Sequence, residues 1–164
     1  MITPFRECCE KMLDNHYLER VLMPWSITRA ITSVDRLNHL ELANTSLPYA
    51  LIVNTAPYPQ NGHWLTLIFN SNGSCIFFDP LGASLPHQPD EISSFIAKNS
   101  ISVEFNLNQI QDINSNFCGF FCISKIISFM LNESHLEFSN HFARDTMLND
   151  TRVVKLIISH ALHI

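Results

Sequence analysis

An apolar run over residues 117–131 constrains this sequence more than any other feature. Its apolar positions fall on almost every side of a helix, and only Ser124, Lys125 and Ser128 form a narrow polar stripe. A helix that is apolar nearly all round is packed inside a domain. We therefore expect a buried central helix that begins near Cys118 and holds this cysteine in its first turn.

The position of Cys118 at the start of this helix predicts a reactive thiol. We expect the side chain of Ser115 or Asn116 to cap the helix by accepting hydrogen bonds from its first free N–H groups. Those N–H groups and the helix dipole favour the thiolate over the thiol, and Gly119 leaves the sulfur open to a substrate. The alternative is a core helix in which Cys118 and Cys122 are packing residues, because buried free cysteines are common.

The composition limits the class of protein. A chain of 164 residues predicts one domain over residues 1–164. No apolar run is long enough to cross a membrane, and the first residues lack the basic and apolar regions of a secretion signal. Five cysteines, two of them adjacent, indicate a reducing, intracellular compartment. The net charge of −5 argues against a broad nucleic-acid surface.

The hydrophobic pattern predicts an α+β fold. Strands are expected where short runs of apolar and β-branched residues lie between turn residues, and helices where apolar residues recur at helical spacing. The expected strands are 49–53, 63–69, 75–79 and 101–105. The expected helices are 3–13, 35–42, 91–98, 118–131 and 151–162.

A hairpin register brings His63 and Asp79 together. Gly73 suits the left-handed third position of a three-residue loop over residues 71–73. That loop pairs Leu65 with Asp79, so His63 lies diagonal to Asp79 on the same face of the sheet, within reach of a hydrogen bond. A two-residue loop would place the two side chains on opposite faces.

These residues have the chemistry of a cysteine hydrolase. A cysteine nucleophile works best with a histidine base, an acid that orients the histidine, and donors for the developing oxyanion. Cys118, His63 and Asp79 supply the first three. Gln111 can donate to an oxyanion beside the Cys118 N–H group, and Gln109 is an alternative that position alone does not exclude.

Several short motifs, in this order and spacing, resemble the adenovirus protease family and the related proteases of Polinton/Maverick elements and adintoviruses. The motifs are Leu51–Ala56, Gly62–Trp64, Phe78–Gly82, Gln111 and Cys118–Cys122. Each motif is weak alone, and together they are specific. The resemblance runs from about residue 51 to residue 131, continues more weakly over 146–149, and is poor in the first fifty residues.

The resemblance implies roles for individual residues. It makes Cys118 the nucleophile, His63 the base, Asp79 the acid and Gln111 the oxyanion donor. Adenoviral members commonly have Glu at the acid position, whereas Asp is found in the related SUMO- and ubiquitin-like-protein proteases. Trp64 resembles the tryptophan that covers a narrow substrate channel and selects glycine, and its alternative role is that of a core residue.

The resemblance also implies a fold and an activity. We expect a mixed sheet flanked by helices, as in adenain and Ulp1-like proteases, with the nucleophile at the tip of the central helix. The expected activity is that of a viral or transposon-encoded cysteine endopeptidase that cleaves capsid and core precursor proteins at glycine-containing sites through a thioester. The alternatives are an isopeptidase for ubiquitin-like modifiers, a non-catalytic binding domain, and a thiol redox or metal protein that uses Cys118 and Cys122.

Expectations about partners follow from the same residues. The partners are protein substrates, viral structural precursors or ubiquitin-like proteins, and we expect a monomer in the nucleus or viral assembly site and in the virion. No metal or cofactor is required, because zinc would need two ligands beyond Cys118 and Cys122. Adenoviral relatives are activated by DNA and by a disulfide-tethered peptide. No cysteine lies near Ser100, where the tether would form, so we expect any activating peptide to bind non-covalently. The chain has 10 Lys and Arg residues against 15 Asp and Glu residues and no basic run, so we expect DNA to give little stimulation.

Overall fold

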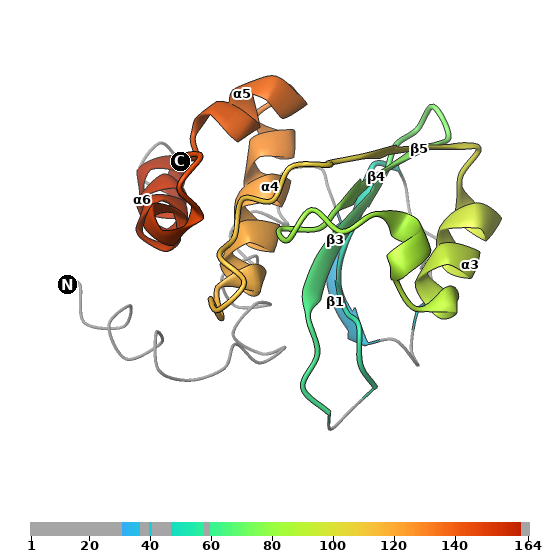
Figure 1. Ribbon diagram of the computed structural model, residues 1–164. Helices are drawn as coiled ribbons and strands as arrows, with labels where there is room; N and C mark the ends of the chain where they lie inside the picture. The colour runs from blue at the N-terminus through green and yellow to red at the C-terminus, as the bar shows by residue number, and fades with distance from the viewer. Residues whose placement is uncertain (1–30, 37–39, 41–46, 58–59, 162–164) are drawn as a thin grey trace.

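The computed structural model describes residues 31–36, 40, 47–57 and 60–161 of the chain (Figure 1). Five strands form one mixed sheet in the order β1-β2-β3-β4-β5. The pairs β1/β2 and β4/β5 are parallel, and the pairs β2/β3 and β3/β4 are antiparallel. The strands are β1 (Ile31–Arg36), β2 (Tyr49–Asn54), β3 (Trp64–Phe69), β4 (Ser74–Phe78) and β5 (Ser102–Phe105).

Helices cover both faces of the sheet, so the predicted α+β class is confirmed (Figure 1). One face packs against α3 (Asp90–Asn99), whose buried residues Ile92 and Ile96 share a core with Leu51 and Leu67 of the central strands. The other face packs against α4 (Cys118–Met130) and, behind it, α6 (Asn149–Ala161). Two 3₁₀ turns, η2 (Leu85–His87) and η3 (Thr146–Leu148), and the short helix α5 (His135–Asn140) complete the described elements.

The central helix α4 is buried as its sequence predicts. Every residue from Gly119 to Ser128 is buried, including the polar stripe of Ser124, Lys125 and Ser128. The helix lies across β2 and β3, whose twelve residues are all buried, and it has sheet on one side and α6 on the other (Figure 1). This packing fixes the position of Cys118 relative to the ends of the central strands.

The hairpin between β3 and β4 has the predicted register. Thr66 pairs with Phe78 and Phe69 pairs with Cys75, and Gly73 has the left-handed φ of 84° that the three-residue loop requires. The Asn70 and Ser74 backbones close this loop with a hydrogen bond of 2.8 Å. The residue before β3, His63, and the residue after β4, Asp79, therefore lie at the same end of the sheet and on the same face.

Two sequence-based expectations are wrong in their details. The cap of α4 is Phe117, without a side-chain hydrogen bond, so neither Ser115 nor Asn116 caps the helix. The start of the helix expected over 35–42 is instead the end of β1, because Asp35 and Arg36 pair with β2. The helix expected over 3–13 lies outside the described residues. Among the residues that the structure describes, no helix combines the length and apolarity needed to span a membrane.

Candidate active site

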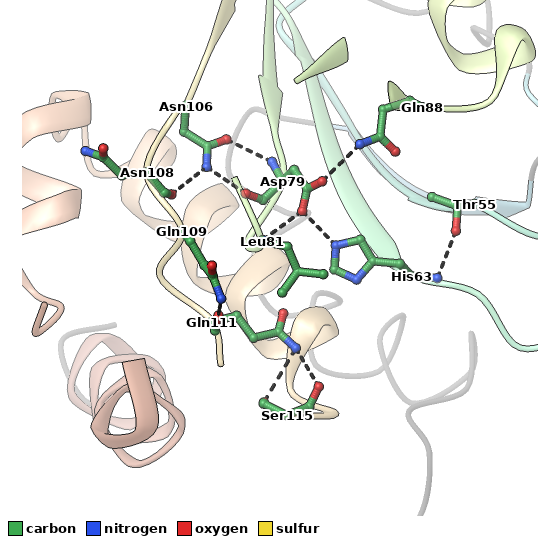
Figure 2. Close-up of polar contacts among 10 residues, drawn as sticks. All are labelled: Thr55, His63, Asp79, Leu81, Gln88, Asn106, Asn108, Gln109, Gln111 and Ser115. Atoms are coloured by element: carbon green, nitrogen blue, oxygen red, sulfur yellow. Dashed lines mark hydrogen bonds and ion pairs between the residues drawn. The ribbon is translucent and has the colours of Figure 1, made fainter. Parts of the chain in front are cut away.

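His63 and Asp79 meet at the end of the β3/β4 hairpin. Nε2 of the His63 ring lies 2.7 Å from Oδ1 of Asp79, and the ring nitrogen donates to the carboxylate (Figure 2). The Asp79 side chain is 1% exposed and the His63 side chain 22% exposed. A buried carboxylate that accepts this hydrogen bond fixes the orientation of the imidazole ring and stabilises its protonated form.

Both carboxylate oxygens of Asp79 have further protein donors. Oδ1 also accepts from the Leu81 N–H at 2.8 Å, and Oδ2 accepts from Nε2 of Gln88 at 3.0 Å. Asn106 holds the Asp79 backbone from the neighbouring strand, accepting from its N–H at 2.9 Å and donating to its carbonyl at 2.6 Å (Figure 2). Since buried carboxylates are stable only when hydrogen-bonded, these contacts stabilise the buried Asp79 side chain and keep it directed at His63.

The turn after Asp79 joins the acid to the segment that carries Gln111. The Gly82 N–H donates to the Asp79 carbonyl at 2.9 Å, and Gly82 has a φ of 71°. A Cβ at Gly82 would lie 2.7 Å from the Gln109 nitrogen, so only glycine allows this approach. The Pro80 carbonyl accepts from both the Ile110 and Gln111 N–H groups, at 2.9 and 3.0 Å.

The Cys118 side chain interacts with the His63 ring. The Cys118 side chain hydrogen-bonds with the His63 ring, and because Asp79 occupies Nε2, the nitrogen left for the sulfur is Nδ1. Burial lowers the pKa of His63, but the hydrogen bonds and charges of Asp79 and Cys118 outweigh this effect and raise the pKa from 6.5 to about 9. His63 is therefore protonated at neutral pH, and an imidazolium beside a sulfur favours the nucleophilic thiolate.

The start of α4 leaves two backbone donors beside the sulfur. The Phe120 and Phe121 N–H groups donate to the Phe117 carbonyl at 2.9 and 3.2 Å. Within the described part of the chain, the N–H groups of Cys118 and Gly119 have no such acceptor. Free N–H groups at a helix N-terminus are suited to a developing oxyanion.

The other described cysteines differ sharply from Cys118. Cys75 and Cys122 are fully buried, and Cys118 is partly exposed. Burial raises the pKa of Cys75 to about 12 and raises that of Cys122 well above its usual value. None of the three is in a disulfide. In the described residues, no three His, Cys, Asp or Glu side chains are grouped to hold a metal ion.

Gln111 lines a cleft that Cys118 also lines, and Gln109 does not line it. The Gln111 side chain is 1% exposed, and its Nε2 donates to the Ser115 carbonyl at 2.8 Å (Figure 2). Gln109 is exposed, and its Nε2 donates to the Gln111 carbonyl at 2.8 Å. The structure therefore favours Gln111 as the glutamine able to reach an oxyanion at Cys118.

A cleft of about 290 Å³ opens over these groups. Trp64 lines it and is only 4% exposed, because its ring also packs in the core on the α4 side of the sheet. Gly119 is buried in the first turn of α4. The residues that line the cleft are Asn54, Gln60, Asn61, Gly62, His63, Trp64, Leu81, Gln111, Ile113, Ser115, Asn116 and Cys118.

A larger cavity of about 550 Å³ lies elsewhere, between β5, the end of α4 and the segment that leads into α5. Lys125 lines it, 3% exposed, with its ammonium 4.6 Å from the centre of the Phe138 ring. Burial lowers the pKa of Lys125 to about 8, although Glu133 and Glu104 oppose this shift. The lining of this cavity includes no cysteine, whereas Cys118, His63 and Gln111 all line the smaller cleft.

Two residues that hold Asp79 are missed by sequence reasoning. Gln88 and Asn106 lie 9 and 27 residues from Asp79, on segments that the local pattern does not connect to it. Asn106 directly follows the predicted strand 101–105, and a polar residue at the end of a strand next to β4 was the available signal. Gln88 has no local signal.

One family of known proteins matches this chain. The family described as adenovirus endoprotease matches residues 41–149, a range that includes His63, Asp79, Gln111 and Cys118. No curated protein sequence matches the chain significantly.

Two solved structures share the fold at low sequence identity, and a third aligns more weakly. The central domain of the uncharacterized Lpg1148 protein from Legionella pneumophila aligns with a TM-score of 0.57 and 12% identity, over 94% of this chain and all of that domain. ChlaDub1 from Chlamydia trachomatis aligns with a TM-score of 0.50 and 15% identity, over 70% of this chain and 59% of that chain. A de-sumoylating protease aligns with a TM-score of 0.47 and 16% identity, over 95% of this chain and 83% of that chain.

Proposed function

Because the chain belongs to the adenovirus endoprotease family and is a cysteine-type peptidase, we propose that it cleaves viral or transposon-encoded capsid and core precursor proteins at glycine-containing sites. The observation that carries the proposal is the contact of His63 with Asp79 on one side, at 2.7 Å, and with Cys118 on the other. In this arrangement, a nucleophilic sulfur lies beside a proton donor.

In the first half of the proposed reaction, the Cys118 sulfur attacks the carbonyl carbon of the scissile peptide bond. The carbonyl oxygen becomes an oxyanion, which accepts hydrogen bonds from the Cys118 N–H group and from Nε2 of Gln111. His63 then gives its Nδ1 proton to the leaving nitrogen as the C–N bond breaks. The products of this half are a free amine and a thioester on Cys118.

In the second half, water hydrolyses the thioester. His63, now neutral, takes a proton from the attacking water through Nδ1, while Asp79 keeps the ring oriented through Nε2. The same donors stabilise the second oxyanion. Collapse of the intermediate breaks the C–S bond, releases the product as a carboxylic acid that then loses its proton to solvent, and restores the thiolate–imidazolium pair.

The shape of the cleft supports a preference for glycine near the cut. Trp64 and Leu81 both line the cleft that contains the nucleophile, and Trp64 is held by the core behind it. A residue without a side chain passes most easily between such groups. We assign to Trp64 the role of covering the substrate, and to Gly119 that of keeping the approach to the sulfur open.

The proposed biology extends to location and activation. The enzyme would act as a monomer in the infected cell, in the nucleus or viral assembly site, and in the virion. It would need no metal and little help from DNA. An activating peptide would bind without a disulfide, for example along the outer edge of β5, which pairs with no described strand on that side.

The test is cleavage of matched substrates by the full chain in the presence of reductant. The substrates are a peptide library with and without glycine near the cut, and isopeptide-linked ubiquitin and SUMO. We expect peptide cleavage that requires glycine and is absent in Cys118→Ala. Efficient hydrolysis of the modifiers with no peptide cleavage would establish the isopeptidase alternative, and binding without hydrolysis of either substrate would establish a non-catalytic domain.

A further inference from the structure

We propose that Ser115 and Asp150 are positioning residues for the Gln111 side chain, so that the start of α6 is part of the active-site scaffold. The inference rests on the proposed function, in which Gln111 donates to the oxyanion. It concerns a hydroxyl and a carboxylate that act through the Gln111 side chain rather than on the reacting atoms.

The Ser115 carbonyl fixes the orientation of the Gln111 side-chain amide. Nε2 donates to this carbonyl at 2.8 Å, whereas Oε1 is buried and has no hydrogen-bond partner in the described part of the chain. A reversed amide would set Oε1 against the carbonyl oxygen, which is repulsive. An amide nitrogen carries two hydrogens. Besides the carbonyl, Nε2 has only a long contact of 3.5 Å with Ser115 Oγ, so one hydrogen can be given to an acceptor in the cleft that Gln111 shares with Cys118.

The Ser115 hydroxyl is held between α6 and the start of α4. Oγ donates to Oδ1 of Asp150 at 2.8 Å and accepts from the Phe117 N–H at 3.1 Å. Phe117 directly precedes Cys118. One serine therefore fixes the acceptor of the Gln111 amide, and Asp150 anchors this serine from 35 residues away.

The start of α6 also holds the chain on either side of Gln111. Asn149 is fully buried, and its Nδ2 donates to the Ile110 carbonyl at 2.8 Å. Thr146, just before α6, donates from Oγ1 to Asp112 at 3.3 Å. These contacts fix the backbone before and after Gln111, and the bond from Ser115 to Asp150 fixes the acceptor of its side chain.

The carboxylate of Asp150 suits its place in the fold. It lies in the first turn of α6, where the helix dipole favours a negative charge. Burial raises its pKa, the Ser115 hydrogen bond lowers it, and Asp112 raises it further. The bond to Ser115 is therefore one of the few contacts that favour a charged Asp150 at this partly buried position.

The experiment compares Ser115→Ala, Ser115→Thr and Asp150→Ala with Asp90→Ala as the matched control. Asp90 also lies in the first turn of a helix, α3, on the opposite face of the sheet. We expect kcat to fall about tenfold or more in Ser115→Ala and Asp150→Ala, with KM within twofold. Ser115→Thr should keep most of the activity, and Asp90→Ala should match the wild type.

Two readouts separate positioning from a general structural effect. Alkylation of Cys118 by iodoacetamide forms no oxyanion, so its rate should stay within twofold in Ser115→Ala. In a Gln111→Ala background, Ser115→Ala should cost no more than a further twofold, because the group it positions is already gone. Parallel loss of alkylation, a fully additive loss of kcat, or unchanged turnover in Ser115→Ala would overturn the proposal.

A third readout does not require activity. The side-chain amide signals of Gln111 in ¹H–¹⁵N spectra, identified by their absence in Gln111→Ala, should move in Ser115→Ala and Asp150→Ala and stay in place in Asp90→Ala. A wild-type protein that cleaves nothing but shows these shifts would contradict the proposed function alone. Gln111 signals that do not move in either variant would overturn the positioning role alone.

Discussion

Nε2 of His63 lies 2.7 Å from Oδ1 of Asp79, although the two residues are 16 positions apart, one directly before β3 and the other directly after β4. The three-residue turn closed by Gly73 sets the register that makes this contact. Because Nε2 is occupied by the carboxylate, Nδ1 is the nitrogen that faces Cys118. The hairpin therefore decides both the distance to the acid and the ring nitrogen that transfers the proton.

Replacement of Cys118 by alanine should abolish peptidase activity and leave the melting temperature close to that of the wild type. Iodoacetamide should label Cys118 near neutral pH far faster than the buried Cys75 and Cys122, because burial raises the pKa of both of these thiols. Mass spectrometry of digests checks the order of labelling. Equal labelling of the three cysteines, or an active alanine variant, would remove Cys118 from the role of nucleophile.

The pH dependence of kcat/KM should report the raised pKa of His63. Its folded-state pKa of about 9 lies above the ordinary 6.5, so the ring keeps its proton, and the enzyme its general acid, until the pH approaches 9. The same shift stabilises the fold fully below pH 6.5, and this contribution is lost as the pH rises through about 9.

Asp79→Asn should move the alkaline limit of this profile to lower pH. The charge of Asp79 raises the pKa of His63 while burial lowers it, so removal of the charge should lower the pKa of His63. Turnover should fall by roughly 10³-fold, because an asparagine can also hold the ring in the wrong tautomer. A pH–rate profile of the variant checks both effects, and an unmoved alkaline limit would show that Asp79 does not act on His63.

Gln111→Ala should lower turnover by about 10²–10³-fold, the usual cost of losing one oxyanion donor. Gln109→Ala should stay within about threefold of wild type, because the Gln109 side chain is exposed and reaches only the Gln111 carbonyl. Steady-state kinetics of the two variants checks the assignment. The reverse order of effects would mean that Gln109 is the donor.

Lys125→Met should stabilise the protein by about 1–3 kcal/mol at pH 7, because the buried ammonium has no hydrogen-bond acceptor in the described residues. The folded-state pKa of about 8 lies below the ordinary 10.5, so wild-type stability should rise between pH 8 and 10.5 and the variant should lack this rise. Chemical unfolding at pH 7 and pH 10, with the exposed Lys155→Met as control, measures both effects. A less stable variant at pH 7 would mean that the Phe138 ring and the nearby glutamates outweigh the cost of burial.

DNA should give little or no stimulation of peptidase activity. The chain has 10 Lys and Arg residues against 15 Asp and Glu residues, and Lys125, one of the ten, is buried. Neutralising phosphates requires exposed basic clusters. Activity with and without DNA at low salt, with reductant present, is the measurement, and a strong rate increase that disappears with added salt would reveal a basic face.

The sequence predicts the hairpin and the central helix well because both depend on local signals. Gly73 specifies its own turn, and the turn specifies which residues oppose each other across β3 and β4. The apolar run specifies a buried helix, and its start places Cys118. The pair of His63 and Asp79 could therefore be expected before the structure was known.

The same local reasoning fails where a distant segment competes. Ser115 looks like a helix cap from its neighbours, but its hydroxyl bonds to Asp150, 35 residues later, and to the Phe117 N–H group. Asp35 and Arg36 look like the start of a helix, but parallel pairing with β2 places them in a strand. In both cases a long-range hydrogen bond outweighs the local preference, and no local pattern contains that information.

The Pro80 carbonyl, which accepts from the Ile110 and Gln111 N–H groups, divides the chain into parts with different freedom to change length. Residues 81–109 form a segment that begins and ends beside the Pro80 carbonyl. An insertion or deletion far from both ends of this segment, such as one between α3 and β5, therefore leaves the distance between Asp79 and Gln111 unchanged. The short stretches 79–82 and 106–117 have no such freedom. Length variation among homologues should therefore concentrate in the middle of the segment 81–109 and be rare at its two ends.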